Sequence, residues 1–181
     1  MRARSVVFGL ALLLVTALAA CTQAAAPTAT PIPPSPTPEE SPDVQAAREL
    51  WQSLQEAKYP DNWATVPGKG TLYRGQGPHG MLLSTYLNDA AAQAMQDKPG
   101  TMPDGAIIVK ENYTPEKELA AITVMVKQAG YDPDHNDWFW TKFGPDGEVQ
   151  AAGKPAGCIA CHGSVRSNDF IFTFPIAPIQ P

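Results

Sequence analysis

A proline-rich segment near the N-terminus restricts the folded part of this chain to residues 43–181. The segment, residues 22–42, reads TQAAAPTATPIPPSPTPEESP and holds seven of the 19 prolines in the 181-residue chain, with almost no side chain that could build a core. Such a sequence favours an extended, semi-rigid spacer, and a proline-rich ligand motif for a partner is the alternative. The remaining 139 residues suffice for one domain that buries roughly two-thirds of its unfolded surface.

The first twenty residues are typical of a signal peptide. Arg2 and Arg4 give a positive start, and residues 6–18 form an uncharged, mostly apolar run. This run is too short to span a bilayer, which needs about 20 apolar residues. It ends in Leu-Ala-Ala-Cys at residues 18–21, which resembles the bacterial lipobox, in which the cysteine is lipidated and becomes the mature N-terminus. An ordinary signal peptide cleaved nearby is the alternative.

Three parts are therefore expected: a lipoprotein signal peptide at 1–20, a lipid-anchored linker at 21–42 and one folded domain at 43–181. Acyl chains on Cys21 would hold the exported protein at a membrane surface, on the periplasmic or extracytoplasmic side. Loss of the signal peptide leaves 11 Lys and Arg against 18 acidic residues, so the formal charge changes from -5 to -7. This acidic balance argues against nucleic-acid binding, which requires a basic surface.

Hydrophobic periodicity in the folded part predicts two helices and five strands. Ser41 as N-cap and Pro42 at the first helical position begin a helix that ends before Pro60. Asn88 caps a shorter helix that ends at the Lys-Pro-Gly sequence of residues 98–100. Runs of β-branched or aromatic residues predict strands at 81–87, 106–112, 119–127, 137–143 and 148–152. Consecutive strands with short links favour an antiparallel sheet, so we expect an α+β fold, mainly β, with a few flanking helices.

The sequence Cys158-Ile-Ala-Cys161-His162, near the C-terminus, is a c-type haem attachment motif. Two thiols three positions apart can form thioethers with the two vinyl groups on one edge of a porphyrin. The next residue, His162, can then present its imidazole to the iron. Thioether haem is made outside the cytoplasm, where the signal peptide would send the chain. The motif therefore predicts one covalently attached haem c, bound through Cys158 and Cys161, with His162 as the metal ligand.

Other interpretations of this motif fit the chain less well. A thioredoxin-like redox pair requires an α/β setting with the cysteines at the start of a helix, whereas this motif follows a sheet-rich region. A zinc site would need a fourth ligand and usually has a second ligand cluster, which the sequence does not offer. A chance occurrence of five residues is the remaining alternative.

The sixth ligand of a haem iron is not fixed by the motif. The candidates are two histidines and three methionines: His79, His135, Met81, Met102 and Met125. Electron-transfer cytochromes often use a methionine or a second histidine at this position. His79 is the strongest candidate because it lies in a loop that enters a strand, whereas His135 has a solvated loop context and Met125 a core one. We expect that no protein side chain binds the sixth position strongly.

An ordered set of motifs resembles the cytochrome P-460 and cytochrome c′-beta superfamily. The matching stretches together cover most of residues 60–175. They are Pro-His-Gly at 78–80, TYLNDA at 85–90, PDGAIIVKE at 103–111, ITVM at 122–125, DWFW at 137–140, CIACHG at 158–163 and NDFIFT at 168–173. The haem motif alone is weak support for a family, whereas the ordered set is fairly specific.

The resemblance implies a compact, sheet-rich fold, usually a homodimer, with His162 as the proximal ligand and an open or weakly occupied distal position. It implies a small nitrogen-containing ligand or substrate and a redox partner protein. Family members either oxidise hydroxylamine, with nitric oxide as an intermediate, or bind nitric oxide and similar gases. In the enzymatic branch a lysine is crosslinked to the haem macrocycle, and Lys110 matches that lysine. The resemblance thus gives Lys110 a cofactor-binding and catalytic role.

Strand periodicity gives a second interpretation of Lys110. Residues 106–109 are four consecutive apolar residues, so both faces of this strand should be covered. Lys110 shares one face with Ala106 and Ile108, and Glu111 lies on the opposite face. One of the two charged side chains should therefore point towards a covered face unless the strand frays. A lysine at the end of a strand that extends to solvent is the alternative to haem contact.

One departure from the family pattern concerns the distal pocket. Hydroxylamine-oxidising members carry a carboxylate on the strand that matches residues 121–125, and Thr123 occupies that place here. A threonine hydroxyl is a poor base, and Glu111 could replace the carboxylate only if it faced the same pocket. Three functions therefore stay open: a hydroxylamine-oxidising cytochrome, a non-enzymatic nitric oxide-binding protein, and a simple electron-transfer cytochrome whose sixth position is closed by His79 or a methionine.

Overall fold

The computed structural model describes residues 40–176 of the chain. The expected signal peptide, the lipidation site Cys21 and most of the linker lie outside the described residues, so their roles stay predictions. Among the described residues no helix is both long and apolar enough to cross a membrane.

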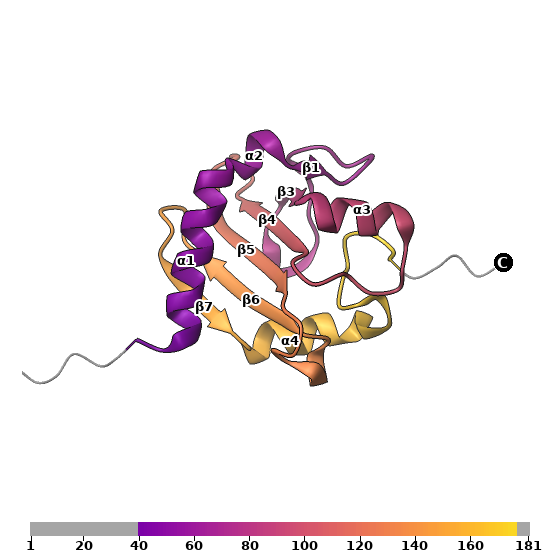
Figure 1. Cartoon of the computed structure of the whole chain (residues 1–181). Helices are drawn as coiled ribbons and strands as arrows, with labels where there is room; N and C mark the ends of the chain where they lie inside the picture. The colour runs from indigo at the N-terminus through magenta and orange to yellow at the C-terminus, as the bar shows by residue number, and fades with distance from the viewer. Residues whose placement is uncertain (1–39, 177–181) are drawn as a thin grey trace, which may run out of the picture. The chain divides into compact units, whose positions relative to one another are not determined.

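A single antiparallel sheet forms the centre of the domain (Figure 1). Six of its strands follow the order β1-β3-β4-β5-β6-β7, and β2 also pairs with β3. The strands are β1 Ala64–Thr65, β2 Tyr73–Arg74, β3 Leu82–Leu87, β4 Ile107–Tyr113, β5 Leu119–Lys127, β6 Trp138–Phe143 and β7 Val149–Gly153. This confirms the predicted α+β, mainly antiparallel fold. The five expected strands are all present, whereas β1 and β2, of two residues each, have no periodicity that could reveal them.

Both predicted helices form where their capping residues indicate. Ser41 accepts a hydrogen bond from the backbone N–H of Val44 at 3.3 Å, and Asn88 accepts one from Ala91 at 3.0 Å. The helices and helical turns are α1 Pro42–Ala57, α2 Tyr59–Asn62, η1 Gly77–His79, α3 Asp89–Asp97, η2 Pro133–His135, α4 Ala156–His162 and η3 Gly163–Asn168. The sequence pattern did not indicate α4, because seven residues are too few for a helical period.

One face of the sheet packs against α1 and α2. Ala47, Leu54 and Tyr59 from these helices join a buried cluster with strand residues such as Val109 and Phe143. α1 runs beside β7, as Figure 1 shows. Because most members of this cluster are apolar and nearly inaccessible to solvent, this face behaves as a conventional closed core.

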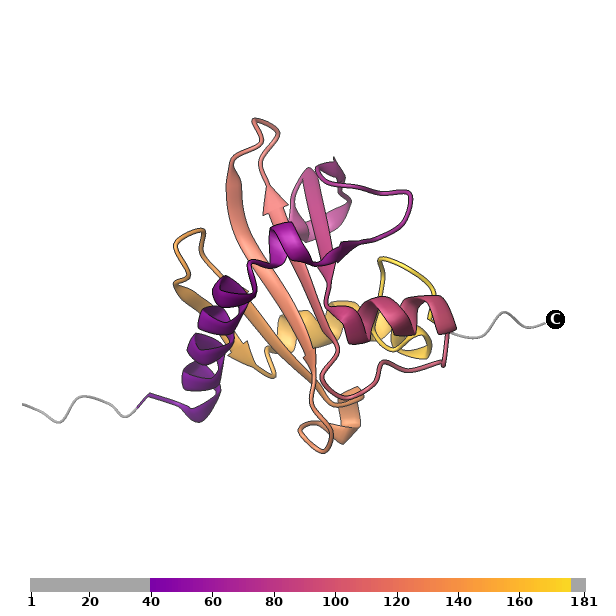
Figure 2. The ribbon, with the colours of Figure 1, turned by 45° about the horizontal axis from the view of Figure 1, so that its top comes forward.

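The opposite face packs against α3, α4 and the chain that follows α4. Figure 2 shows α4 passing behind the strands. Ile108, Met125 and Trp140 from the strands join Ala91 of α3 and Phe170 of the C-terminal segment in a second buried cluster. Cys158 and Ile159 of α4 pack against this cluster. The fold therefore brings the cysteine motif onto the face of the sheet that α1 leaves free.

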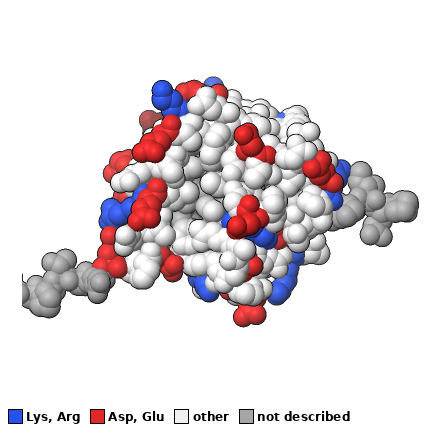
Figure 3. All heavy atoms as spheres, viewed as in Figure 1, with Lys and Arg blue, Asp and Glu red and all other residues white. Residues whose placement is uncertain are grey.

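Charged side chains of both signs are interspersed over the surface seen in Figure 3. Acidic residues stand beside basic ones along α1, for example Glu40 with Arg48 at 2.8 Å. On this face of the described chain there is no basic stripe of the kind that follows a nucleic-acid backbone.

Candidate cofactor site

Helix α4 carries both cysteines of the motif on one side. Cys158 and Cys161 are three positions apart, and residues at this spacing are neighbours on a helix surface. Neither cysteine is in a disulfide, Cys158 is half-buried and Cys161 is exposed. Burial raises the pKa of the Cys158 thiol. The two thiols are thus available to one flat group that lies beside the helix.

His162, the last residue of α4, is oriented by the backbone. Its Nδ1 lies 2.7 Å from the carbonyl oxygen of Phe170. Because a carbonyl can only accept, Nδ1 carries the proton and donates, which leaves Nε2 as the nitrogen able to bind a metal. His162 is only 7% exposed, and this burial lowers its pKa, so the imidazole is held neutral, as a metal ligand must be.

Aromatic side chains surround the His162 ring. The Trp140 ring lies 4.9 Å from it and the Phe172 ring 5.2 Å, measured between ring centroids. These bulky neighbours restrict the rotation of the imidazole and limit the access of water to it. The environment therefore supports one fixed orientation of the ring.

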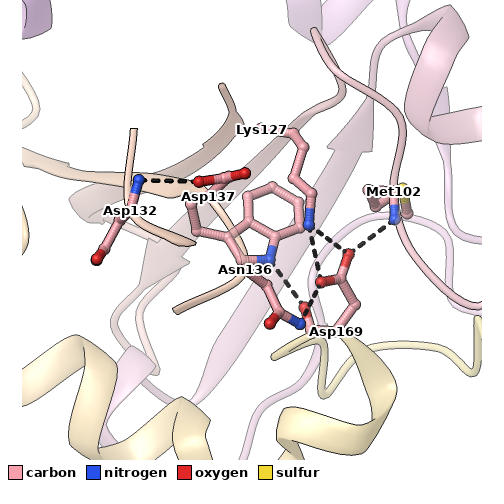
Figure 4. A network of polar contacts seen from close by, with 7 residues as sticks. Met102, Lys127, Asp132, Asn136, Asp137 and Asp169 are labelled. Atoms are coloured by element: carbon pink, nitrogen blue, oxygen red, sulfur yellow. Dashed lines mark hydrogen bonds and ion pairs between the residues drawn. The ribbon is translucent and has the colours of Figure 1, made fainter. Parts of the chain in front are cut away.

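A buried polar network holds the carbonyl that orients His162 (Figure 4). The Asp169 carboxylate accepts hydrogen bonds from the Lys127 ammonium at 2.8 and 3.0 Å and from the Asn136 amide at 2.9 Å. It also accepts the backbone N–H of Met102 at 2.7 Å, and the Trp138 indole donates to the Asp169 carbonyl at 2.9 Å. Since Phe170 directly follows Asp169, the network also fixes the position of the Phe170 carbonyl.

The backbone at this turn has a conformation that needs such support. Asp169 has φ 52° and Phe170 has φ 62°, both in the left-handed region that non-glycine residues rarely adopt. Asp169 is 1% exposed, so its charge would be costly without the Lys127 partner. The motif is therefore tied to β5 and β6 through residues that follow it in the chain.

A cavity of about 560 Å³ lies between α4 and the free face of the sheet. Its volume is within the range of about 300–1,000 Å³ usual for cofactor sites. The walls include Cys158, Cys161 and His162 from α4, and Ile108, Met125 and Trp140 from the strands. The cavity thus joins the two thiols and the imidazole to a mostly apolar wall.

Three buried side-chain polar atoms have no partner among the described residues, and all three belong to residues that line the cavity. Oδ1 of Asn112 and Nε1 of Trp140 lie on the cavity face of the sheet, whereas the Thr141 hydroxyl shares its strand face with Phe139 and Phe143 of the other core. Unpaired buried polar groups are rare in folded proteins and call for a partner. Together with two thiols, a neutral imidazole and an apolar wall, they fit a large, flat, covalently attached group with a metal at its centre. The residues present therefore fit a c-type haem.

Lys110 lies in the wall of the same cavity as Cys161 and His162. It stands on β4 between Ile108 and Asn112, which share its face, and pairs in register with Thr85 on β3 and Thr123 on β5. Burial, and then the charge of nearby Lys69, lowers the pKa of Lys110 to about 8. The structure thus directs this side chain to the cavity rather than to open solvent.

Glu111 lies on the other face of the sheet. It is 6% exposed, and its carboxylate accepts hydrogen bonds from the hydroxyls of Tyr59 at 2.9 Å and Tyr113 at 2.6 Å. Lys110 and Glu111, the two charged residues near the end of β4, therefore point to opposite faces of the sheet, and neither extends freely into solvent. Glu111 does not line the cavity, so it cannot replace the distal carboxylate for which Thr123 stands.

His79 comes from a distant part of the chain to lie near His162. The two ring centroids are 6.0 Å apart and the rings are nearly perpendicular, at 88°. Nδ1 of His79 lies 3.4 Å from the Thr123 hydroxyl, a long contact. Burial, and then the Lys110 charge, lowers the pKa of His79 to about 4, so the ring is neutral. His79 and Thr123 are thus among the polar residues that line the cavity with His162.

The other candidate sixth ligands are placed differently. Met81 and Met125 line the cavity, Met81 at its exposed rim, whereas Met102 and His135 do not. His135 lies 2.8 Å from the Asp132 carboxylate. Within residues 40–176 no group of three or more His, Cys, Asp or Glu side chains could hold a metal ion by itself, and a zinc site at the motif would need further ligands.

Comparison with known proteins agrees with the geometry of the site. Residues 60–173 match the family described as Cytochrome P460, a span of more than half the chain that includes Lys110, Thr123 and the cysteine motif. No curated protein matches the chain. The family implies a covalently bound c-type haem, which the residues of the cavity fit. The chain belongs to the cytochrome P460 family.

Proposed function

We propose that this protein carries out redox chemistry on small nitrogen species, hydroxylamine or nitric oxide, at an open distal position of one haem c. Cys158 and Cys161 form the thioethers and His162 binds the iron. The observation that carries the proposal is the place of Lys110. The family pattern gives a lysine at this position a bond to the haem, and here Lys110 lines the cavity together with Cys161 and His162.

The geometry of the site supports separate roles for the haem, His162 and Lys110. The haem, when bound, supplies the redox-active iron. The Phe170 carbonyl and the Trp140 ring keep Nε2 of His162 directed towards the cavity. With a pKa lowered to about 8, Lys110 has a larger neutral fraction near neutral pH than an ordinary lysine, and only the neutral amine is a nucleophile.

Peptide mass spectrometry tests the role of Lys110. After protease digestion, a single haem-bearing species that joins the Cys158 peptide to the Lys110 peptide would establish the crosslink. Haem on the cysteine peptide alone would end that idea. The variant Lys110→Gln is the control, because it keeps a polar side chain that is only one atom shorter and cannot form the bond.

A turnover assay tests the oxidase. We expect the holoprotein to oxidise hydroxylamine with an artificial electron acceptor faster than an equal concentration of free haem, and Lys110→Gln to be slower. A rate no higher than that of free haem would exclude the oxidase.

A specific observation favours a second candidate, a nitric oxide-binding protein without turnover. Thr123 replaces the distal carboxylate and Glu111 points to the opposite face, so among the described residues no carboxylate lines the cavity. A bound substrate would then lack a strong base to take its protons. Ferrous holoprotein that fails to bind nitric oxide would rule out this candidate.

The position of His79 favours a third candidate, an electron carrier. Its neutral ring lies 6.0 Å from the His162 ring, so an imidazole is at hand for the sixth position of the iron. Visible and electron paramagnetic resonance spectra distinguish the cases. High-spin, five-coordinate iron at neutral pH supports the open site, and low-spin iron that becomes high-spin in His79→Ala supports the carrier.

The proposal includes export and lipid anchoring through Cys21, and a homodimeric assembly. Metabolic labelling with a radioactive fatty acid, compared between the natural chain and Cys21→Ser, tests the anchor. Loss of label and release from the membrane in the variant are expected. Light scattering of the purified domain tests the dimer.

A further inference from the structure

A second cavity, of about 490 Å³, lies beside the first. The two share part of their walls, including His79, Lys110 and His162. Residues of the segment 69–77 line the second cavity and not the first. This segment contains β2 and has no part in the chemistry proposed above. This segment is therefore the place to look for a further role.

The walls of the second cavity are positively charged. Lys69, Arg74 and Lys110 all line it, and its lining contains no Asp or Glu. None of these three cations takes part in the ion pairs formed among residues 40–176. What distinguishes this surface, in a chain with 18 acidic residues and 13 Lys and Arg, is that three cations line one cavity and no acidic side chain does.

Of the two exposed cations of this wall, Lys69 packs over an aromatic ring, and the backbone of Arg74 is paired in the sheet. The Lys69 ammonium lies over the Tyr73 ring, 5.0 Å from its centroid, and the Tyr73 hydroxyl is 2.7 Å from the Thr85 hydroxyl. Arg74 lies on β2, opposite Leu82 of β3, and the next residue is Gly75. A Cβ at Gly75 would overlap the carbonyl of Gly80, so only glycine allows this close approach of the two backbone segments.

The lowered pKa of Lys110, which follows from burial and from the Lys69 charge, agrees with cations that lie close together without an anion between them. An anion in the cavity would relieve this repulsion. The arginine fork suits two oxygens in one plane, and the lysine adds a point charge. The chemistry of the wall thus matches a small, singly charged oxyanion with two oxygens.

We propose that Lys69 and Arg74 form a binding site for such an oxyanion next to the haem. Two sources supply this chemistry: a propionate carboxylate of the haem itself, and free nitrite, an oxidation product of hydroxylamine and nitric oxide. The propionate source requires only the haem, whereas the nitrite source rests on the function proposed above.

The test uses full-length ferric holoprotein, the double variant Lys69→Gln/Arg74→Gln and the charge-matched control Lys58→Gln/Lys117→Gln. Lys58 and Lys117 are exposed and line neither cavity. Calorimetric titration with sodium nitrite at constant ionic strength measures the affinity for the free anion. Spectroelectrochemistry measures the midpoint potential of the haem. Covalent haem content and the circular dichroism spectrum show that each variant is folded.

The two sources give different results. If the site binds free nitrite, the double variant binds it about tenfold or more weakly than the control does. If the site holds a propionate, nitrite affinity does not change, while the potential of the double variant falls below that of the control, because the propionate loses the two cations that neutralise it. If both quantities equal those of Lys58→Gln/Lys117→Gln, the proposal is wrong. Neither measurement uses hydroxylamine turnover, so failure of this proposal and failure of the proposed function are distinguishable.

Discussion

The two faces of the sheet differ in what their polar groups find as partners. On the face under α1 and α2, the buried Glu111 is bound by two tyrosine hydroxyls. On the face under α4, Asn112 and Trp140 each leave a buried polar atom without a partner beside a cavity of about 560 Å³. Apart from the Thr141 hydroxyl, which has no partner among the described residues, the first face is complete without any added group. The second face has the composition of a site that a cofactor completes.

Of the changes considered, loss of the Cys158 and Cys161 thiols should alter the cavity face most. We expect Cys158→Ser/Cys161→Ser to contain no covalent haem, because these are the two cysteines in the described part of the chain. Haem staining of a denaturing gel measures the loss. Retention of covalent haem in the double variant would contradict the assignment. The cavity face should also become less protected in hydrogen exchange, while the face under α1 keeps its protection.

Truncation of a core side chain on the complete face should affect stability alone. Phe143 is 0% exposed, and its ring lies 5.1 Å from that of Trp51. We expect Phe143→Ala to lower the free energy of unfolding by about 3–5 kcal/mol. The visible spectrum of the folded holoprotein should not change. A shifted spectrum would show that the two faces are coupled more tightly than their separate clusters suggest.

Disruption of the Asp169 network should affect both stability and the haem. Asp169→Asn leaves the buried Lys127 ammonium without its charge partner, a loss of about 3–5 kcal/mol in denaturant unfolding. If the Phe170 carbonyl moves, the hydrogen bond from Nδ1 of His162 weakens. The imidazole then donates less electron density to the iron, and the midpoint potential of the haem rises.

The double variant Lys127→Met/Asp169→Asn provides the control for that experiment. It removes both charges, so part of the lost stability should return, while the altered potential should remain. A potential equal to that of the natural protein in both variants would show that the network stabilises the fold without orienting His162.

Alkaline pH should destabilise the face under α1 and α2, by less than the substitutions above. Burial, and then Glu111, raises the pKa of Tyr59 above its ordinary value of 10.0, and burial likewise raises that of Tyr113. A raised folded pKa gives stability that is present below pH 10 and is lost as the pH rises above it. The free energy of unfolding should therefore fall above pH 10, and Tyr59→Phe should show a shallower fall. An equal slope in the two proteins would contradict this origin.

The sequence was sufficient for the elements with a clear periodic signal. The strands from 82 to 153 alternate or run continuously apolar, and Ser41 and Asn88 cap helices at the expected positions. The opposite orientations of Lys110 and Glu111 also follow from the period of two, since successive strand residues point to opposite faces.

Other features depend on contacts between distant parts of the chain. His79 and His162 are brought together by a turn before β3 and by α4, and no local pattern records that proximity. The pair Lys127 and Asp169 is separated by 42 positions. The role of Asp169 had one usable signal, because an acidic residue that directly precedes the apolar Phe-Ile-Phe run at 170–172 calls for a buried partner. Which lysine supplies it could not be predicted.

The arrangement of the attachment residues has a consequence for the order of maturation. Cys158, Cys161 and His162 lie within one seven-residue helix, so haem can be captured by this short segment before the sheet has formed. Lys110 and His79 reach the same cavity only when β4 and the turn before β3 are in place. Thioether formation can thus come first in time, and any bond between Lys110 and the haem must wait for the folded chain.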